Sequence, residues 1–202
     1  VYTGSAISAN TATAKNPNGT AVTLSYTYKY YTNDTCTTGE TATAPTNVGT
    51  YYVKATSTAT SNLNSASSNC AEHKITQAAD TVNLTAVNTT YTGSAIAANA
   101  ATATSGTTIT YKYYNGGECS GTALSGAPTD VGDYSVKATS AGNNNYASGS
   151  ICKTHKITKG TPTLSLTGKS TVYTGSAISA NTATAKNPNG TSVTLTYSYK
   201  YY

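Results

Sequence analysis

Residues 22–31 read Val-Thr-Leu-Ser-Tyr-Thr-Tyr-Lys-Tyr-Tyr, and most of their apolar side chains alternate with polar ones. An alternation of period two sends successive side chains to opposite faces of an extended chain, so this stretch predicts a strand with one buried face. The same alternation returns at Tyr51–Ala55, Ile109–Tyr113 and Tyr134–Ala138. No helical period accompanies it, and the pattern therefore predicts an all-β protein.

The composition agrees with strands and argues against several classes of function. The 202 residues include 18 Tyr but no Phe, Trp, Met or Arg, and Thr and Tyr are typical of strands. The net charge of +5 comes from Lys residues spread almost singly, without a basic cluster, so nucleic acid is not expected as a partner. The longest apolar stretches are only a few residues, and no membrane span is expected in this segment.

Internal repetition is the strongest signal in the chain. Residues 1–31 recur as residues 172–202 with three differences, and residues 91–96 match residues 2–7. We predict three repeats: repeat 1, residues 1–78, which lacks its first strand; repeat 2, residues 79–159, which is complete; and repeat 3, residues 160–202, an N-terminal half. Since neither end forms a whole domain, we expect it to be completed by further repeats of a longer array or by strands of a neighbouring subunit.

Repeats 1 and 3 contain a longer hairpin than repeat 2. In repeat 1 the turn Lys15–Thr20 joins two strands, with Pro17 presetting one turn dihedral and Gly19 supplying a positive one. Ser105-Gly106 takes its place in repeat 2. We expect the longer hairpin to contact a neighbouring repeat or subunit. Its candidate contact residues are Asn16, Pro17, Asn18, Gly19, Val22 and Leu24.

The ordered motifs of each repeat resemble a known family. Asp130-Val131-Gly132-Asp133-Tyr134 resembles the Asp-x-Gly-x-Tyr corner of immunoglobulin domains. Together with Tyr-Thr-Gly-Ser-Ala-Ile, the Asn-rich loop at 143–146 and a closing Ile-Thr-Lys, it is similar to the bacterial Ig-like surface-protein repeats of the MBG type. The resemblance implies tandem Ig-like antiparallel β-sandwiches, end to end, in secreted or cell-surface proteins, where such domains act as spacers or stalks.

The four cysteines depart from that family pattern and are considered separately. They fall two per repeat, Cys36 with Cys70 and Cys119 with Cys152. Of the three pairings that four cysteines allow, only the one within repeats gives each copy the same structure. We therefore predict one disulfide per repeat, near the rim of the sandwich. Each would stabilise its repeat by about 3 to 4 kcal/mol and would place the protein in an oxidising compartment.

A metal site and an enzyme are the alternatives to a purely structural protein. His73 and His155 each follow a cysteine by three residues, but two Cys and one His per repeat are fewer than the four ligands of a structural zinc site. The two histidines recur at one strand position, and the seven acids form no recurring pair. We expect no cofactor, no metal and no catalytic residue.

Tyrosine and asparagine supply the remaining candidate surfaces. Most tyrosine rings are expected in the core, and their hydroxyls are expected to find hydrogen-bond partners at the edge of the sandwich. An outer set, which could bind a glycan or a neighbouring subunit, is expected at Tyr31, Tyr52, Tyr114 and Tyr202. Acceptor patterns for N-glycosylation occur at Asn18, Asn33, Asn83, Asn88 and Asn189.

The sequence thus favours a structural role outside the cell. We expect a segment of an extracellular fibre, stalk or filament whose partners are neighbouring repeats or subunits of the same protein. The alternative is an adhesive module that binds glycan or another surface protein through its Tyr-rich faces or long hairpin. Short connections at Gln77–Asp80 and Lys159–Thr161, without a flexible spacer, favour the structural role.

Overall fold

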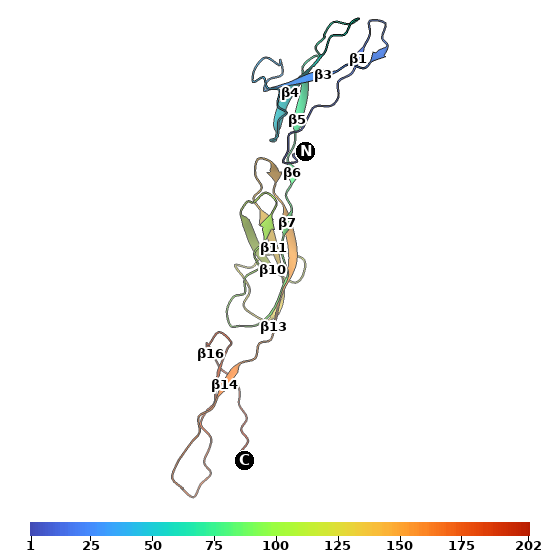
Figure 1. Ribbon diagram of the computed structural model, residues 1–202. Helices are drawn as coiled ribbons and strands as arrows, with labels where there is room; N and C mark the ends of the chain where they lie inside the picture. The colour runs from blue at the N-terminus through green and yellow to red at the C-terminus, as the bar shows by residue number, and fades with distance from the viewer. The chain divides into compact units, whose positions relative to one another are not determined.

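The computed structural model describes all 202 residues as short strands joined by turns and loops, without any helix (Figure 1). The predicted all-β class is confirmed. No helix that is long and apolar enough to cross a membrane is present. The chain divides into two compact units. Unit 1 comprises Val1–Thr81, Thr104–Thr107 and Ser140–Gly149, and unit 2 comprises Val82–Ala103, Thr108–Thr139 and Ser150–Tyr202.

Unit 1 is built on a three-stranded antiparallel sheet in the order β3-β4-β5. Its register places Tyr28 opposite Ala55 and Tyr30 opposite Val53, which pairs large rings with smaller side chains on what we call the inner face. The hairpin β1-β2 and the parallel pair β6-β12 complete the unit. The strands are β1 (Ala14–Lys15), β2 (Ala21–Val22), β3 (Tyr26–Tyr31), β4 (Gly49–Ser57), β5 (Ala71–Ile75), β6 (Ala78–Ala79) and β12 (Tyr146–Ala147).

Unit 2 contains a four-stranded sheet in the order β10-β11-β13-β8, in which β8 pairs parallel to β13. The pair β7-β9 and the three-stranded sheet β14-β15-β16 accompany it. The strands are β7 (Val82–Asn83), β8 (Val87–Thr90), β9 (Thr102–Ala103), β10 (Ile109–Asn115), β11 (Gly132–Ser140), β13 (Ser150–Thr158), β14 (Thr163–Ser165), β15 (Thr184–Lys186) and β16 (Ser192–Val193).

The core of repeat 2 is made of a few aliphatic side chains and tyrosine rings. Val82 and Leu84 pack against Tyr113, Val136 and Ala138 of the four-stranded sheet. Val136 and Ala138 are wholly buried. In a chain without Phe, Trp or Met, tyrosine rings supply the bulk of such a core while alanines fill the space around them.

The predicted strand over residues 22–31 is divided in the structure. Val22 pairs with Ala14 in the β1-β2 hairpin, whereas Tyr26 pairs with Ser57 in the larger sheet. The chain therefore leaves one sheet and enters another between these residues. The side-chain alternation continues across this change because it depends on the extended backbone and not on which strand supplies the hydrogen bonds.

Candidate contact sites

Tyrosine hydroxyls tie the segment before each hairpin to the inner face of the sheet. In repeat 2 the backbone N–H groups of Ala98 and Ala101 donate to the hydroxyl oxygens of Tyr113 and Tyr111, at 2.8 and 2.7 Å. Each ring thus fills the core while its hydroxyl satisfies an amide outside the strand ladder, as expected. The corresponding pairs in repeats 1 and 3 are Ala9–Tyr30, Ala12–Tyr28, Ala180–Tyr201 and Ala183–Tyr199.

A second tyrosine pair closes the corner before the long strands β4 and β11. The Tyr51 hydroxyl donates to the Asn47 carbonyl oxygen at 3.0 Å, and the Tyr134 hydroxyl donates to the Asp130 carbonyl oxygen at 3.2 Å. A tyrosine that bonds to the backbone a few residues upstream is the tyrosine corner of immunoglobulin-like domains. The Asp-x-Gly-x-Tyr motif therefore has the local structure that its resemblance implies.

The prediction that Tyr31 and Tyr114 form an exposed outer surface is wrong. They are only 6% and 8% exposed, because the loop after each strand folds back over the outer face of the sheet. The loop after β3 returns at Thr41, whose N–H donates to the Tyr30 carbonyl oxygen at 3.0 Å. Of the other two predicted outer tyrosines, Tyr52 is half-buried and Tyr202 is exposed.

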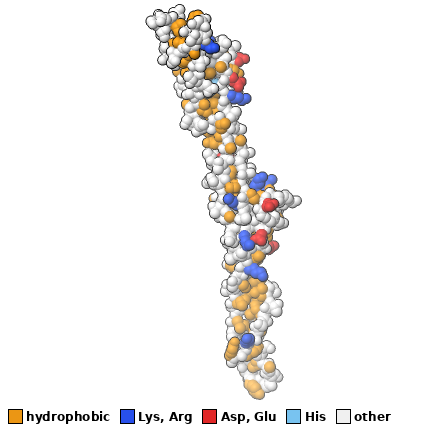
Figure 2. All heavy atoms as spheres, turned by 90° about the vertical axis from the view of Figure 1, so that its right-hand side faces the viewer, with side chains coloured by type: hydrophobic (Ala, Val, Ile, Leu, Met, Phe, Trp, Pro, Cys, Tyr) orange, Lys and Arg blue, Asp and Glu red, His pale blue; other side chains and the backbone are white.

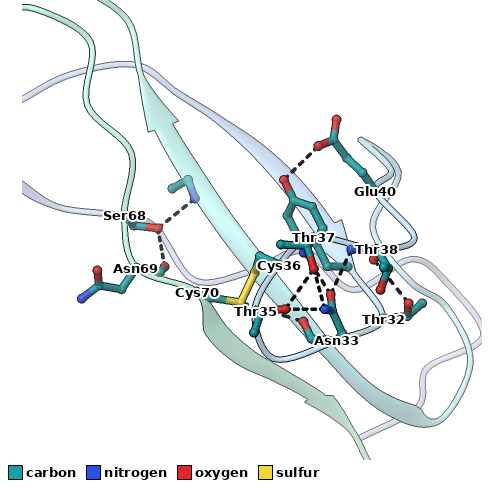
Figure 3. Close-up of a disulfide and its surroundings, with 12 residues drawn as sticks. Thr32, Asn33, Thr35, Cys36, Thr37, Thr38, Glu40, Ser68, Asn69 and Cys70 are labelled. Atoms are coloured by element: carbon teal, nitrogen blue, oxygen red, sulfur yellow. Dashed lines mark hydrogen bonds between the residues drawn. A yellow bond between two sulfur atoms is a disulfide. The ribbon is translucent and has the colours of Figure 1, made fainter.

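The two disulfides attach these covering loops to the sheet. Cys36 bonds to Cys70 and Cys119 bonds to Cys152, with Cα atoms 5.8 and 6.0 Å apart. The loop residues Cys36 and Cys119 share a left-handed backbone, with φ of 51° and 49°, so the two loops are built alike. In Figure 3 the loop that contains Cys36 lies over the strands and is joined to Cys70, the residue immediately before β5.

The loop of the first disulfide is organised by Asn33. Its side-chain oxygen accepts hydrogen bonds from the N–H groups of Thr37 and Thr38, both at 3.0 Å, and its amide nitrogen donates to the Thr37 hydroxyl at 2.8 Å (Figure 3). This candidate glycosylation residue is therefore engaged in holding its own loop. Asn18, Asn83 and Asn88 are exposed.

The two histidines occupy equivalent strand positions but differ in burial. His73 Nε2 lies 2.9 Å from the Ile7 carbonyl oxygen, whereas His155 is wholly buried and neither of its ring nitrogens makes a hydrogen bond of normal geometry. The His155 ring instead packs edge-on to Tyr113, with ring centroids 5.5 Å apart. Burial lowers the pKa of His155, and the backbone of Ile96 offsets this only in part. Its neutral ring is thus a core side chain.

Charged side chains are few and dispersed, as Figure 2 shows for one face. The pKa of Glu40 is lowered first by its hydrogen bond from the Lys29 ammonium and second by the Tyr31 hydroxyl. Lys156 pairs with Asp133 at 3.0 Å on the surface. No group of three or more His, Cys, Asp or Glu side chains comes together.

Within unit 1, the Asn-rich loop of repeat 2 contacts repeat 1. The side-chain oxygen of Asn145 accepts a hydrogen bond from the Val48 N–H at 3.0 Å, and the Gln77 amide donates to the Asn143 carbonyl oxygen at 2.8 Å. Tyr146 packs edge-on against Tyr2, with centroids 5.3 Å apart. The run of asparagines is visible in the sequence, but the residues that they touch are not, because those partners lie far away along the chain.

Within unit 2, the long hairpin of repeat 3 contacts the Tyr-Thr-Gly-Ser corner of repeat 2. The Asn189 N–H donates to the Thr92 carbonyl oxygen, and its side-chain amide donates to the Ser94 hydroxyl, both at 3.0 Å. The equivalent residue of repeat 1, Asn18, makes no such contact in this structure and bonds only within its own turn. The predicted hairpin residues Asn16, Pro17, Asn18, Val22 and Leu24 line a shallow surface hollow with Asn62 and Leu63.

Repeat 2 carries the similarity of this chain to a known family. Residues 80–161 match the family model of the MBG domain. Repeat 2 is therefore similar to an MBG domain. No curated protein matches the chain. The MBG domain is a repeat module of surface proteins, and repeat 1 shares the disulfide, the tyrosine corner and the hydroxyl bonds of the MBG repeat.

Proposed function

We propose that this chain is a structural, non-enzymatic segment of an extracellular fibre, stalk or filament, built from tandem Ig-like β-sandwiches. The observation that carries the proposal is the recurrence of one stabilised arrangement. Repeat 1 and the MBG repeat each join a nine-residue strand, β4 or β11, to neighbouring strands and close one side with a disulfide. Repetition of one scaffold, without any recurring cluster of reactive groups, is typical of a spacer.

The disulfides support a place outside the cell and resistance to extension. Disulfides persist in oxidising compartments, and each of these closes a loop of over thirty residues. A closed loop cannot lengthen when the strands around it separate. Repeats 1 and 2 can therefore each give up only part of their length under load.

The adhesive alternative loses its main support, because Tyr31 and Tyr114 lie beneath the covering loops. Applying the chain to an array of surface glycans tests the adhesive alternative directly. We expect no selective, saturable binding. Binding that depends on the exposed hairpin Asn16–Thr20 would favour adhesion over a purely structural role.

The structural role is tested on intact cells that make the protein. Antibodies against repeat 2 should label filaments or stalks in electron micrographs, and external protease should remove the label without breaking the cells. The polypeptide mass under denaturing conditions, with and without reductant, separates a long single chain from an assembly of small subunits. Label confined to the cell interior, with all four cysteines as free thiols, would refute the proposal.

A further inference from the structure

The two disulfides differ in how well the surrounding chain covers them. Cys36 is 7% exposed and Cys70 is half-buried, whereas Cys119 is half-buried and Cys152 is exposed. The first strand of repeat 2 does not cover Cys152, because the pairing of β8 with β13 begins only at His155. An exposed disulfide is open to attack by a thiolate, and a buried one is shielded from it. Repeat 2 therefore has the more accessible bond.

The charges on the same face of the sheet also differ between the repeats. Lys137 lies directly opposite Cys152 in the register of β11 and β13, and Lys54 takes its place in repeat 1. Two residues after the strand cysteine, where the side chain returns to the same face, repeat 1 has Glu72 and repeat 2 has Thr154. The acid offsets the lysine in repeat 1 alone. An attacking thiolate is an anion, and it is therefore attracted more strongly to the bond of repeat 2.

The remaining charges nearby leave this difference in place. Each covering loop has one unpaired acid, Asp34 in repeat 1 and Glu118 in repeat 2. Glu40 of repeat 1 pairs with Lys29, whereas the counterpart of that lysine in repeat 2, Lys112, makes no ion pair. The other lysines lie farther along the strand or on its opposite face: Lys74, Lys156 and Lys153.

The covering loops differ in what holds them besides the disulfide. In repeat 1 the side-chain oxygen of Asn33 accepts two N–H groups of its own loop, both at 3.0 Å. Gly116 takes the place of Asn33 in repeat 2, and residues 116–123 make no hydrogen bond among themselves. Away from its two ends, this loop is held by one hydrogen bond, from the Cys119 N–H to the Ser135 hydroxyl at 2.8 Å.

We propose that the Cys119–Cys152 bond is a thiol-exchange site, whereas the Cys36–Cys70 bond stays closed under the same conditions. The thiolate of a small thiol attacks Cys152 Sγ and forms a new S–S bond with it, while the bond to Cys119 breaks. The electron pair goes to Cys119 Sγ, which takes up a proton from water. A second thiol then attacks the added sulfur, so that two thiols become one disulfide and Cys152 is released as a thiol.

Opening of this bond frees the loop of repeat 2. The loop then keeps only the hydrogen bond from Cys119 to Ser135 in its middle, and it can lift from Tyr114, which is 8% exposed in the closed state. The loop of repeat 1 has the bonds of Asn33 in addition. Thiols would thus let repeat 2 extend further than repeat 1 under load. This consequence, unlike the exchange itself, rests on the proposed fibre function.

The exchange is measured on the intact 202-residue chain with reduced glutathione in the absence of oxygen. Freed thiols are blocked with iodoacetamide at intervals and located by mass spectrometry. Cys119 and Cys152 should be labelled at least about tenfold faster than Cys36 and Cys70. Glutathione should be found on Cys152 as the mixed disulfide.

The variants T154E and E72T are matched, because both positions are exposed and each variant gives one repeat the residue of the other. With glutathione, T154E should slow the opening of repeat 2, and E72T should speed the opening of repeat 1. Cysteamine carries a cationic amine in place of the carboxylates of glutathione. Its reaction should therefore show a smaller preference for repeat 2.

Opening of the loops is measured by amide hydrogen exchange after both disulfides have been reduced with excess dithiothreitol. The Leu124 N–H donates to the Tyr113 carbonyl at 2.8 Å, and the Thr41 N–H donates to the Tyr30 carbonyl at 3.0 Å. The Leu124 amide should exchange faster after reduction, whereas the Thr41 amide should stay protected. The N33G substitution should remove that protection.

Three results would overturn the inference. The first is equal rates of opening of the two disulfides, and the second is glutathione attached to Cys119 in place of Cys152. The third is a Leu124 amide that stays as protected as the Thr41 amide after reduction. None of these measurements depends on where the protein lies, and failure to find surface filaments would leave them standing.

Discussion

At the scale of single residues, Tyr113 combines a core side chain with a backbone contact. Its ring belongs to the core, and its hydroxyl oxygen accepts the hydrogen bond of the Ala98 N–H. The Y113F substitution keeps the ring and leaves a part-buried amide unpaired. We expect it to lower the free energy of unfolding of repeat 2 by about 1 kcal/mol, measured by urea denaturation.

The matched control for Y113F is Y201F. Tyr201 makes the equivalent bond to Ala180 in repeat 3, but its side chain is 69% exposed. Water can replace the lost bond there, so Y201F should change the stability very little. If the two substitutions lower the free energy of unfolding equally, burial is not the reason why the hydrogen bond to the Tyr113 hydroxyl stabilises the protein.

The buried His155 makes stability depend on pH. Because burial lowers the pKa of His155 in the folded state below the usual histidine value of about 6.5, the unfolded chain binds a proton more readily than the folded one as the pH falls. The stabilisation is therefore complete above about pH 6.5 and is lost progressively as the pH falls from there toward the lower pKa of the folded state.

The measurement is the melting temperature of the chain between about pH 7.5 and about pH 5, a range above the usual pKa of carboxyl groups. We expect a fall for the natural chain and a much flatter profile for H155Q. An H155Q chain with the same pH dependence as the natural one would mean that another group is responsible.

At the scale of elements, the long hairpin offers an internal comparison. Gly93 and Gly4 occupy equivalent turns with φ of 89° and 82°. A Cβ at Gly93 would lie 2.8 Å from the Asn189 side-chain nitrogen, whereas a Cβ at Gly4 would meet nothing within 4 Å. The G93A and G4A substitutions therefore add the same kind of backbone strain, but only the first disturbs the hairpin contact.

The expected result is faster hydrogen exchange of the Asn189 amide in G93A, because its hydrogen bond to the Thr92 carbonyl would be displaced. G4A should leave that amide as protected as in the natural chain. If G93A leaves it protected too, the hairpin of repeat 3 does not depend on this close approach.

The elements also show how far the sequence predicts this fold. Alternating side chains located β3, β4, β10 and β11, since a period of two requires only an extended backbone with one buried face. The alternation could not show that Val22 and Tyr26 pair in different sheets. It also placed Tyr31 on the outer face but could not foresee the loop that buries it. Both errors have one cause, because pairing partners and covering loops depend on residues far away in sequence.

At the scale of the whole molecule, the disulfides should set the stability of the repeats. Substitution of Cys119 and Cys152 together by Ser removes one closed loop, and we expect a loss of about 3 to 4 kcal/mol on the chain-entropy model. Calorimetry of the C119S/C152S chain should show a lower melting temperature for repeat 2 alone. In the C36S/C70S chain, the melting temperature of repeat 1 should fall instead. If either pair of substitutions lowered the melting temperatures of both repeats, the two disulfides would not stabilise their repeats independently.

The central claim is that repeats 1 and 2 carry mechanical load and that each is limited in extension by its own disulfide. The most direct test is to pull single 202-residue chains from end to end under oxidising and then reducing conditions. With sequence separations of 34 and 33 between the bonded cysteines, reduction should lengthen the unfolding step of repeat 1 and of repeat 2 by about 110 Å each. Extension without a resisting step, or steps of the same length before and after reduction, would contradict the account.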